Sequence, residues 1–586
     1  MLKKTKIVCT LGPSTKEDAT LREMIKAGMN VARFNFSHGT HESHKVTLDQ
    51  LRRIREEMGV HIAALLDTKG PDVRLQQFKE NPAFDGRQEY QLEEGQSFTL
   101  HATECEGNEN GCTINYKHLA RDVKVGTRIL LDDGLIEMKV IKIHGTDVVC
   151  KVMNTAIIKS NKGVNVPEVR LSMPYMSKKD RDDIEFAIKN EYDYIAASFV
   201  GTAQDVLDIR RILDINKCNT IRIIAKIENA EGVENIKEIL EVSDGIMVAR
   251  GDMGVEIDMA ELPSIQKKLI RMCYTSGKPV ITATQMLESM IHHPRPTRAE
   301  VSDVANAVYD GTSAVMLSGE TAAGLHPVEA VQTMAAIIAR TESNINYSSQ
   351  SRRGDNVYIS VTDALCHAAC STCAEVGADA ILTVSITGKT ARLLSKYRPD
   401  HPIYACVTDE HIARHLSLSW GIYPLVIPVM KTAEELMDKS ERLVRDVGYL
   451  KSGDVVVVVA GVPITGPTNM ITIHLVGESL ISGVGICGDK VKGDVCVCHS
   501  EADAIENFRE GQILVISSTT NALLPIIKQA EAVITEEAGA SSHAAIVGLT
   551  LDKPVIVGAK NATKLLKTGM TVSVDATRGN VLLLED

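Results

Sequence analysis

The sequence has few aromatic residues and no concentration of positive charge. Of its 586 residues only one is Trp and eight are Phe, and the formal net charge is −12. Proteins that bind nucleic acid without sequence preference need a basic patch, and those that bind single strands also use aromatic side chains for stacking. We therefore expect no nucleic-acid partner.

Long hydrophobic runs are also missing. The longest, VVVVVAG near residue 455, is far shorter than the roughly 20 apolar residues that a membrane-spanning helix needs. The N-terminal segment MLKKTKIVCT passes from lysines directly into a strand-like run, without the apolar core of a secretory signal. We expect no membrane association and a cytoplasmic location.

The thirteen cysteines do not indicate a disulfide or metal framework. Their number is odd and the chain is long, which favours reduced thiols. Cys366, Cys370 and Cys373 have helical spacing and are expected in a core. The segment CVCH at 496–499 has two possible metal ligands close together, but no second pair stands at zinc-site spacing.

The length allows three or four domains, and one pattern dominates the first 345 residues. Short runs rich in Val and Ile each end in polar residues, and helical segments such as 20–28 and 261–273 fall between most of them. The eight runs lie at 6–14, 30–39, 62–70, 194–200, 221–229, 245–252, 279–285 and 314–321. Continuous apolar strands alternating with helices indicate a parallel α/β structure covered on both sides.

Eight such units favour a (β/α)8 TIM barrel over an open doubly wound sheet, because the polar strand ends are uniform. The third and fourth runs are separated by about 130 residues that are rich in strands and turns. We interpret residues 71–170 as a β-barrel lid domain inserted into the catalytic barrel, which comprises 1–70 and 171–345.

Beyond residue 345 the composition changes twice. The polar stretch NINYSSQSRRGDN (344–356) is typical of a linker, and a second α/β region follows over 346–474. Glycine-rich sequence near 477–493 marks the start of an additional C-terminal domain, 475–586.

Polar residues at the ends of the apolar runs predict an active site, because the carboxyl ends of barrel strands form the site in this architecture. Period-two spacing places Arg33, Asn35 and Ser37 on one strand face, and Lys226 with Glu228 on another. The polar residues of this set are Arg33, Asn35, Ser37, His38, Asp67, Thr68, Lys69, Lys226, Glu228, Arg250, Asp252, Thr284, Ser318 and Glu320.

Glu228 and Asp252, on neighbouring strands, could share a hard divalent cation such as Mg²⁺, with Lys226 above an anionic group. The alternative is a structural Lys–Glu pair that caps the barrel. Repetition of the pattern on five strands favours a functional site. His38, taken alone, is better explained as a residue that caps a turn.

Several long motifs, in order, resemble the pyruvate kinase family over about residues 1–474. They are NVARFNFSHG, LLDTKGPDVR, NKGVNVP, IIAKIENAEG, MVARGDMGVEI, ATQMLESM with PRPTRAEVSDVANAV, and VMLSGETAAG. The resemblance implies a barrel, a lid, an α/β regulatory domain and a homotetramer. It also implies transfer of the phosphoryl group of phosphoenolpyruvate to ADP, which yields pyruvate and ATP.

The resemblance assigns the residues of the phosphoryl site and the cofactors. Glu228 and Asp252 are similar to the family's Mg²⁺ (or Mn²⁺) ligands. Lys226 resembles the cation that stabilises the phosphoryl group in flight and the enolate left behind. Arg33 resembles a second phosphoryl clamp. The implied K⁺ ligands are Asn35, Ser37, Asp67 and Thr68, the last through its carbonyl.

Further residues correspond to substrate and nucleotide contacts. The backbone from Ala249 through Arg250 and Gly251 to Asp252 would bind the substrate carboxylate at a helix start. Thr284 resembles a carboxylate ligand and, with Ser318, part of the route that protonates the enol carbon. The residues that match nucleotide contacts are Asn35, His38, Arg74 and Lys162.

Two positions depart from the family pattern. Asp72 stands where the family usually has Glu, and members that do not need K⁺ have lysine there, so we expect K⁺ dependence. The segment SITGKTAR (385–392) resembles the regulatory domain's phosphate loop, with Ser385, Thr387, Gly388, Lys389 and Thr390 as candidate ligands. The downstream segment AGVPITGPTN lacks the Trp and Arg of fructose-bisphosphate-activated members, so the implied effector is phosphorylated but unidentified.

The last hundred residues resemble the swivelling phosphohistidine domain of phosphoenolpyruvate-using enzymes, through AGASSHAAIVG, KPVIVG and GMTVSVDATRGNV. That family usually has two glycines where this chain has Ala538 and Gly539. His543 matches the phosphorylated histidine. No segment resembles an ATP-loading domain, so we expect an accessory domain, with a phosphate shuttle as the alternative.

Two other functions remain open alternatives. A metal-dependent lyase that acts through enolpyruvate could use a similar barrel, but it would have no use for the lid motif KGVNVP or for Arg33. A non-catalytic metabolite sensor would not need Lys226, Glu228, Asp252 and Thr284 to be intact.

Overall fold

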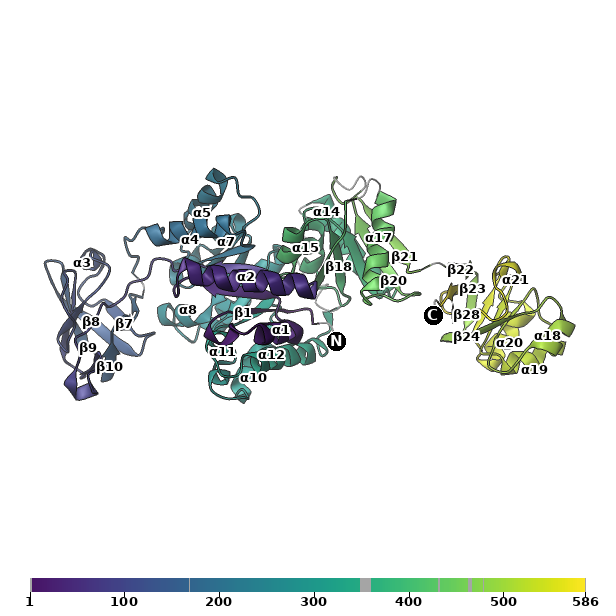
Figure 1. Ribbon diagram of the computed structural model, residues 1–586, viewed down its shortest axis with the longest axis horizontal. Helices are drawn as coiled ribbons and strands as arrows, with labels where there is room; N and C mark the ends of the chain where they lie inside the picture. The colour runs from purple at the N-terminus through teal and green to yellow at the C-terminus, as the bar shows by residue number, and fades with distance from the viewer. Residues whose placement is uncertain are drawn as a thin grey trace. The chain divides into compact units, whose positions relative to one another are not determined.

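The computed structural model describes residues 3–167, 169–347, 360–429, 433–461, 466–477 and 479–584, with the backbone alone at 433, 434, 479 and 480 (Figure 1). Part of the predicted linker (348–356) and residues 462–465 of AGVPITGPTN lie outside this description. The chain forms two compact units: Met1–Cys366 with Ser385–Val426, and His367–Val384 with Ile427–Asp586.

Eight parallel strands close into a barrel, as predicted. The hydrogen-bonded order is β1-β16-β15-β14-β13-β12-β3-β2. The strands are β1 (Lys6–Thr10), β2 (Val31–Asn35), β3 (Ala63–Asp67), β12 (Tyr194–Ala197), β13 (Arg222–Ile227), β14 (Gly245–Ala249), β15 (Val280–Ala283) and β16 (Ala314–Leu317). Each falls within one of the eight apolar runs.

The burial of these strands explains why their sequences are continuously apolar. One set of side chains, including Val8, Val31, Leu65 and Met247, forms a core of its own, and alternate residues pack into a second core with the surrounding helices. Because side chains alternate between the two faces, a strand that is covered on both sides is apolar throughout.

Helices follow most of the strands and cover the barrel. They are α1 (Asp18–Ala27), α2 (His41–Met58), α4 (Lys178–Lys189), α5 (Ala203–Ile215), α6 (Ala230–Glu234), α7 (Ile236–Val242), α8 (Arg250–Glu256), α9 (Leu262–Thr275), α10 (Arg298–Tyr309), α11 (Gly319–Ala322) and α12 (Pro327–Glu342). Short 3₁₀ turns occur at η1 (Pro13–Thr15) and η3 (Glu288–Ile291).

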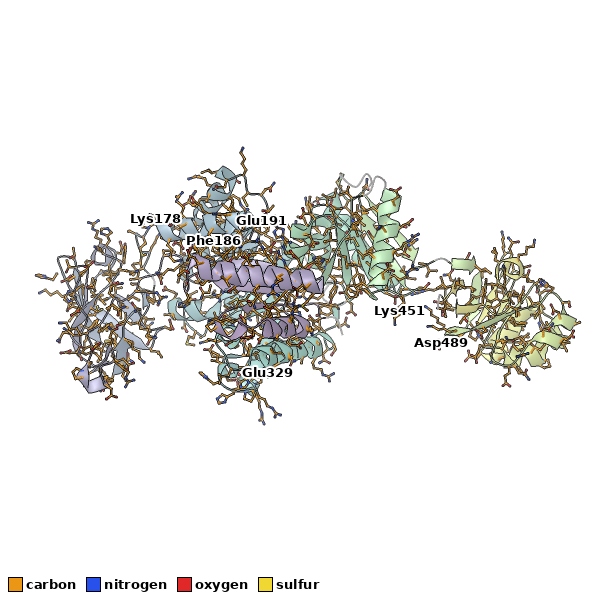
Figure 2. All side chains as sticks on the ribbon, viewed as in Figure 1. Lys178, Phe186, Glu191, Glu329, Lys451 and Asp489 are labelled. Atoms are coloured by element: carbon orange, nitrogen blue, oxygen red, sulfur yellow. The ribbon has the colours of Figure 1, made fainter. Side chains whose placement is uncertain are left out.

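Helix α4 illustrates why these segments are helical. Ser177 accepts a hydrogen bond from the backbone N–H of Asp180 and so caps the first turn. Figure 2 labels Lys178 and Phe186 on this helix. Lys178 is exposed, whereas the Phe186 ring stacks on His41 with centroids 4.5 Å apart. This division between a polar and an apolar face allows α4 to cover the barrel.

The inserted segment is built from strands, as predicted. Its elements are η2 (Pro82–Phe84), α3 (Leu119–Asp122), β4 (Glu89–Leu92), β5 (Ser97–His101), β6 (Gly111–Thr113), β7 (Arg128–Leu131), β8 (Ile136–His144), β9 (Asp147–Val152), β10 (Ala156–Lys159) and β11 (Val164–Asn165). They form a six-stranded sheet, β11-β7-β8-β9-β5-β6, and a β10-β4 pair. Isolated bridges from Arg74 to Gly163 and from Leu75 to Ile114 join its two edges, so irregular backbone completes the predicted barrel.

The α/β region contributes to both compact units. Its elements are α14 (Val361–Glu375), β17 (Ala380–Val384), α15 (Lys389–Lys396), β18 (Ile403–Val407), α16 (Glu410–Leu416), β19 (Ile422–Val426), α17 (Ala433–Asp446), β20 (Val455–Ala460) and β21 (Met470–Leu475). β18 pairs with β19, and β20 pairs with both β17 and β21. The three cysteines of α14 are buried, as predicted.

Residues 385–426 group with the catalytic barrel because many hydrogen bonds join them to its amino-terminal end. Lys6 donates to the Ile422 carbonyl at 2.6 Å, and the Tyr194 hydroxyl donates to the His415 carbonyl at 2.6 Å. Arg414 Nε donates to Asp193, which is fully buried, at 2.7 Å.

The C-terminal segment has a sheet and two cores of its own. The strand order is β22-β29-β28-β24-β25-β26-β27-β23. The elements are β22 (Ser479–Ser482), β23 (Val484–Cys487), β24 (Lys490–Val497), α18 (Glu501–Asn507), β25 (Ile513–Ile516), η4 (Asn521–Leu523), α19 (Leu524–Gln529), β26 (Ala532–Thr535), α20 (His543–Leu551), β27 (Val555–Val557), α21 (Ala562–Leu565), β28 (Thr571–Asp575) and β29 (Asn580–Leu583).

Two kinds of feature are absent from the described part of the chain. Cys496 and Cys498 are buried, and no group of three or more His, Cys, Asp or Glu side chains there is arranged to hold a metal. Among the same residues, no helix has both the length and the apolar character needed to cross a bilayer.

Candidate active site

Lys226 lies at the carboxyl end of β13 with three oxygen partners. Its Nζ is 2.7 Å from Ser198 Oγ, 3.0 Å from Asp67 Oδ1 and 3.0 Å from Glu228 Oε1. Burial alone would lower the pKa of Lys226, but Asp67 and Glu228 outweigh it and hold the pKa above its ordinary value. The side chain is therefore a fixed cation at the barrel mouth.

Arg33 and Asp67 form a second buried pair beside this lysine. Arg33 Nε donates to Asp67 Oδ2 at 2.6 Å, and Nη1 donates to Thr10 Oγ1 at 2.9 Å. Burial would raise the pKa of Asp67, yet Arg33 and Lys226 hold it below its usual value. One carboxylate thus positions two cations, an arrangement suited to gripping an anionic group.

The surroundings of Glu228 and Asp252 disfavour the ionised form of both carboxyl groups. Burial, together with the charges of Asp252 and Asp67 and against the effect of Lys226, raises the pKa of Glu228 to about 7. Burial also raises the pKa of Asp252. Two hard carboxylates with raised pKa values would be stabilised by a divalent cation, so this donor set fits the predicted Mg²⁺.

The predicted carboxylate-binding segment begins helix α8, directly after β14. Gly251 N donates to Thr284 Oγ1 at 2.8 Å, and that hydroxyl donates to the Ala283 carbonyl at 2.6 Å. Thr284 has a φ of 66°, which is strained for a residue with a side chain. The Arg250 side chain points elsewhere and donates to Asp303 at 2.7 Å, so its contribution to a substrate site is confined to the backbone.

Ser318 follows β16, where Glu320 organises the turn. The Ser318 N–H donates to Glu320 Oε2 at 2.7 Å, and the Leu287 N–H donates to Oε1 at 3.0 Å. Glu320 is buried, so its carboxylate acts on the backbone of two loops at the barrel mouth.

The predicted K⁺ ligands come from the ends of β2 and β3. Asn35 and Asp67 are paired directly across the two strands. β2 ends at Asn35, so the expectation that Ser37 shares its strand face is wrong. The chain turns there because Ser37 N donates to Asn35 Oδ1 at 3.1 Å. The Thr68 carbonyl accepts from Ser198 Oγ at 2.6 Å.

A cavity of about 810 Å³ lies between the lid and the barrel. Two of the predicted nucleotide contacts, Arg74 and Lys162, line it from the lid side, and Asp252 lines it from the barrel. His38 is exposed and is not among the lining residues; its carbonyl accepts from His44 at 2.8 Å.

The basic residues of the lid are held by acidic neighbours. Lys162 pairs with Asp132 at 2.7 Å, and Arg74 Nη1 donates to the Asn161 carbonyl at 3.0 Å. Asp72 pairs with Arg74 and with Lys69, the latter at 3.1 Å. Asp72 therefore sits among cations where the lid joins the barrel.

Two residues at the site were not predicted from the sequence. Ser198 contacts Lys226, Asp67 and the Thr68 carbonyl, and Thr10 contacts Arg33. Each stands at the carboxyl end of a strand: Thr10 is the last residue of β1, and Ser198 directly follows β12. The same strand-end rule would have found both, had it been applied to all eight runs.

The predicted phosphate loop precedes α15. Gly388 has a φ of 69°, and the Thr387 side chain is exposed. Lys389 N donates to Thr387 Oγ1 at 3.4 Å, and Arg392 Nη2 donates to the Thr387 carbonyl at 3.3 Å. Ser385 and Thr390 are buried, so the exposed part of the loop is Ile386, Thr387 and Lys389.

His543 begins helix α20 and is hydrogen-bonded through both ring nitrogens. Nδ1 is 2.9 Å from Thr519 Oγ1, and Nε2 is 3.0 Å from Asn521 Oδ1. Because an amide oxygen only accepts, Nε2 donates and Nδ1 accepts. Gly539 nearby has a φ of 115°, a conformation that favours glycine.

Sequence families match three segments of the chain. They are "Pyruvate kinase, barrel domain" over residues 2–331, "Pyruvate kinase, alpha/beta domain" over 363–474, and "PEP-utilising enzyme, mobile domain" over 508–579. The first two together span most of the chain, and the third confirms the predicted resemblance of the C-terminal segment.

Individual pyruvate kinases match almost the whole length. Those of Staphylococcus haemolyticus and Geobacillus stearothermophilus are each 46% identical to the chain, and each match covers 99% of both sequences. The crystal structure of a pyruvate kinase from Cryptosporidium parvum superposes with a TM-score of 0.76 at 38% identity. It covers 81% of this chain and 96% of its own. The chain therefore belongs to the pyruvate kinase family.

Proposed function

We propose that the cavity between barrel and lid transfers the phosphoryl group of phosphoenolpyruvate to ADP, giving pyruvate and ATP in the last step of glycolysis. The observation that carries this proposal is the Lys226 ammonium, held by Ser198, Asp67 and Glu228 at the barrel mouth. A fixed cation at this place stabilises charge that develops on the phosphoryl oxygens and on the enolate.

We propose Glu228 and Asp252 as the ligands of Mg²⁺ or Mn²⁺. Their raised pKa values and hard oxygen donors fit such an ion, and Mg²⁺ usually takes only one or two carboxylates besides water and substrate. When bound, the ion would neutralise charge on the carboxylate and phosphoryl oxygens of the substrate.

Asn35, Ser37, Asp67 and the Thr68 carbonyl form the proposed K⁺ site. All four offer oxygen donors near the ends of neighbouring strands. Asp72→Lys should remove the need for K⁺, because a fixed ammonium near the site would replace the mobile cation. An active, folded variant that still depends on K⁺ would contradict this assignment.

The substrate's phosphoryl group is assigned to Arg33 and Lys226, and its carboxylate to the backbone of residues 249–252 and to Thr284. The first turn of α8 offers backbone N–H groups, which favour an anion, and the Gly251 N–H donates to Thr284 Oγ1 in the absence of substrate. Thr284 and Ser318 then lie along the proposed route of the proton to the enol carbon.

ADP is assigned to the lid side of the cavity, with Arg74 and Lys162 on its phosphates and Asn35 and His38 on the barrel side. His38 is exposed, so it reaches the nucleotide only if the lid closes over the barrel. Closure would also exclude water from the phosphoryl group.

The loop formed by Ser385, Thr387, Gly388, Lys389 and Thr390 is proposed as the site of a phosphorylated activator. A left-handed glycine followed by a helix start and flanked by hydroxyl groups suits a phosphate. We also propose that the chain assembles as a homotetramer, as the resemblance of residues 1–474 implies.

A coupled assay of ADP-dependent pyruvate formation, with Mg²⁺ present and K⁺ added or omitted, tests the proposal. The expected result is pyruvate production that requires ADP and is enhanced by K⁺. Pyruvate released without ADP would indicate a lyase, and binding of phosphoenolpyruvate without turnover would indicate a metabolite sensor.

A further inference from the structure

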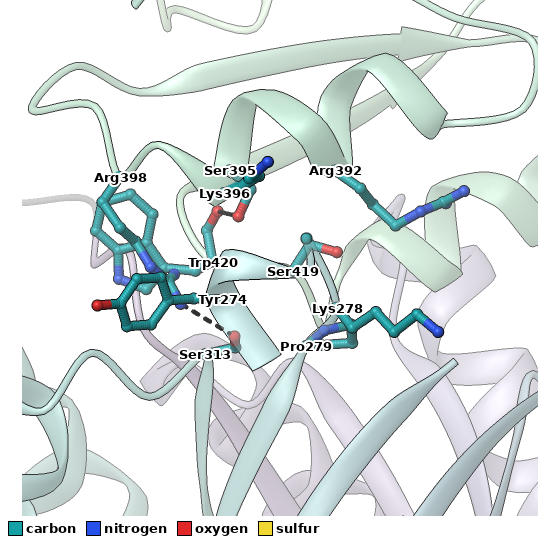
Figure 3. Close-up of a pocket in the computed structure, with 11 residues that line it drawn as sticks. Tyr274, Lys278, Pro279, Ser313, Arg392, Ser395, Lys396, Arg398, Ser419 and Trp420 are labelled. Atoms are coloured by element: carbon teal, nitrogen blue, oxygen red, sulfur yellow. Dashed lines mark hydrogen bonds between the residues drawn. The ribbon is translucent and has the colours of Figure 1, made fainter. Parts of the chain in front are cut away.

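A second cluster of cationic side chains lies at the opposite end of the barrel from Lys226. There the loops that lead into β15 and β16 meet residues 392–420 of the same compact unit. They enclose a cavity of about 10 Å³, roughly the space of one water molecule or one oxygen of a larger anion. Its lining includes four basic residues, Lys278, Arg392, Lys396 and Arg398 (Figure 3).

Arg398 is the most constrained of these residues. It is 6% exposed, and its φ of 48° is strained for a residue other than glycine. Nη2 donates to the Gly311 carbonyl at 2.8 Å and to Ser313 Oγ at 3.3 Å. Among the described residues, Nε and Nη1 have no hydrogen-bond partner. Two buried donor nitrogens of a charged group are therefore unsatisfied, which is costly.

Aromatic rings hold the Arg398 guanidinium in place. Its Cζ lies 4.7 Å from the centroid of the Trp420 ring and 5.8 Å from that of Tyr274, and Figure 3 shows the side chain beside both rings. Cation–π contacts orient a guanidinium but do not satisfy its N–H groups. The free donors remain available to an anion.

The neighbouring cations also lack a carboxylate that compensates for their burial. Burial lowers the pKa of Arg392 and of Arg398 to about 10, and it lowers the pKa of Lys278 as well. A carboxylate partner would act in the opposite direction. Lys396 differs, because it pairs with Asp363 at 2.8 Å. Lys278 and Arg392 are held by backbone carbonyls, those of Ser243 at 2.7 Å and Thr387 at 3.3 Å. Within the described chain, the positive charge of these two residues and of Arg398 is therefore not neutralised by a carboxylate at ion-pair distance.

We propose that this cavity is an anion site that takes a phosphate group, with Arg398 as its anchor. One phosphate oxygen would enter the cavity and accept from Arg398, while the rest of the anion lies in the positive field of Arg392 and Lys278, whose charged ends extend away from Arg398 (Figure 3). The guanidinium fork matches phosphate oxygens. The anchor is separate from the loop around Thr387, because Arg398 lies beyond the carboxyl end of α15 and that loop precedes its start.

The single tryptophan makes the proposal measurable. Trp420 is the only Trp of the chain and contacts Arg398, so its fluorescence reports directly on this cavity. The purified full-length protein is titrated with sodium phosphate at constant ionic strength. We expect a saturable change in fluorescence that survives in Lys389→Gln and in Lys226→Met, which alter two other proposed phosphate sites.

Arg398→Gln should weaken phosphate binding at least tenfold, because the anchor is lost. Since Arg398 is buried and that variant could fail to fold, Lys278→Gln provides a second test. It retains an amide donor for the Ser243 carbonyl, which Lys278 contacts at 2.7 Å, and should weaken binding threefold or more. A wild-type protein without a saturable response, an unchanged affinity in both folded cavity variants, or a response lost in Lys389→Gln would overturn the proposal.

Discussion

Lys226 combines the two conditions that electrostatic catalysis requires of a single residue: it is charged and it is held. Three oxygens replace the water that burial removes, and the side chain has little freedom to move. A transition state therefore meets a cation already in position, without reorganisation of solvent. The same contacts explain why a lysine is tolerated at the end of an apolar strand.

Lys226→Met should lower turnover by about 10³-fold or more, the scale for losing a transition-state cation in phosphoryl transfer. Affinity for phosphoenolpyruvate should change much less. Steady-state kinetics of both forms measure kcat and KM separately. A loss of turnover below about tenfold would show that Lys226 has another role.

Ser198→Ala tests whether the hydroxyl positions the Lys226 ammonium. Its Oγ links Nζ to the Thr68 carbonyl, and hydrogen bonds to charged groups contribute about 1.5–3 kcal/mol. We expect kcat to fall by about 10- to 100-fold with a smaller change in KM. Ser198→Thr retains the hydroxyl and should recover most of the activity; equal losses in both variants would contradict a positioning role.

At the scale of elements, the short loops between strands and helices contain the residues proposed to bind the activator. The loop before α15 turns at Gly388, where a Cβ atom would lie 3.1 Å from Arg392 Nη1 and from a methyl group of Ile412. Positive φ and close packing together make glycine the suitable residue at this position. The exposed Thr387 and Lys389 side chains flank it.

Combined replacement of Thr387, Gly388 and Lys389 by alanine should abolish activation by a phosphorylated effector. Basal turnover should persist, because none of the three lines the catalytic cavity. Candidate sugar phosphates and nucleotides are titrated against both forms in the coupled assay. Equal activation of the two would place the effector elsewhere.

Helix α16 contains His415, a buried histidine that makes the contact between residues 385–426 and the barrel depend on pH. His415 Nε2 donates to the Asp193 carbonyl at 3.1 Å, and within the described chain Nδ1 has no partner. Burial lowers the pKa of His415 to about 4. In the unfolded chain the His415 side chain has a pKa of about 6.5. It therefore binds a proton more readily there than in the folded protein, so protonation favours unfolding.

This contribution to stability is present above about pH 6.5 and is lost as the pH falls toward 4. The thermal midpoint of wild type should therefore fall more between pH 7 and pH 5 than that of His415→Gln, which cannot be protonated. Differential scanning calorimetry at the two pH values measures both. If the thermal midpoint decreased equally in the two proteins between pH 7 and pH 5, His415 would be excluded as the titrating group.

At the scale of the whole molecule, the C-terminal domain is the part with no assigned task. Its sheet and cores are its own. The match to the Cryptosporidium parvum structure covers 81% of this chain and 96% of that protein. That protein therefore has few residues outside the part that the two share. We propose the boundary near residue 475, with the barrel, lid and α/β regions at 1–70 with 171–345, 71–170 and 346–474.

Truncation near residue 475 should retain most of the kinase turnover, and His543→Ala should behave as wild type. His543 is engaged by Thr519 and Asn521, and the lid already brings ADP to the phosphoryl group in the proposed mechanism. Incubation with phosphoenolpyruvate labelled on phosphorus checks this. Acid-labile, base-stable label that is absent from His543→Ala would support a phosphate shuttle instead.

Most of the barrel and of its active site could be predicted from the sequence alone. Strands covered on both faces must be continuously apolar, and the residues at their carboxyl ends must meet at one rim. These two local rules located the eight strands and grouped Lys226, Glu228 and Asp252. The relatives support the family and the reaction, while the roles of individual residues stay predictions.

Only the tertiary structure decided which partners these residues have. Ser198 meets Asp67 across 131 positions of sequence, and Arg398 reaches the Ser313 hydroxyl across 85. Ser37 does not lie on the predicted strand face, because the chain turns after Asn35 and a local hydrogen bond stabilises that turn. Periodicity reports which face of its own element a side chain occupies. It carries no information about which distant element packs there, because that depends on how the whole chain closes.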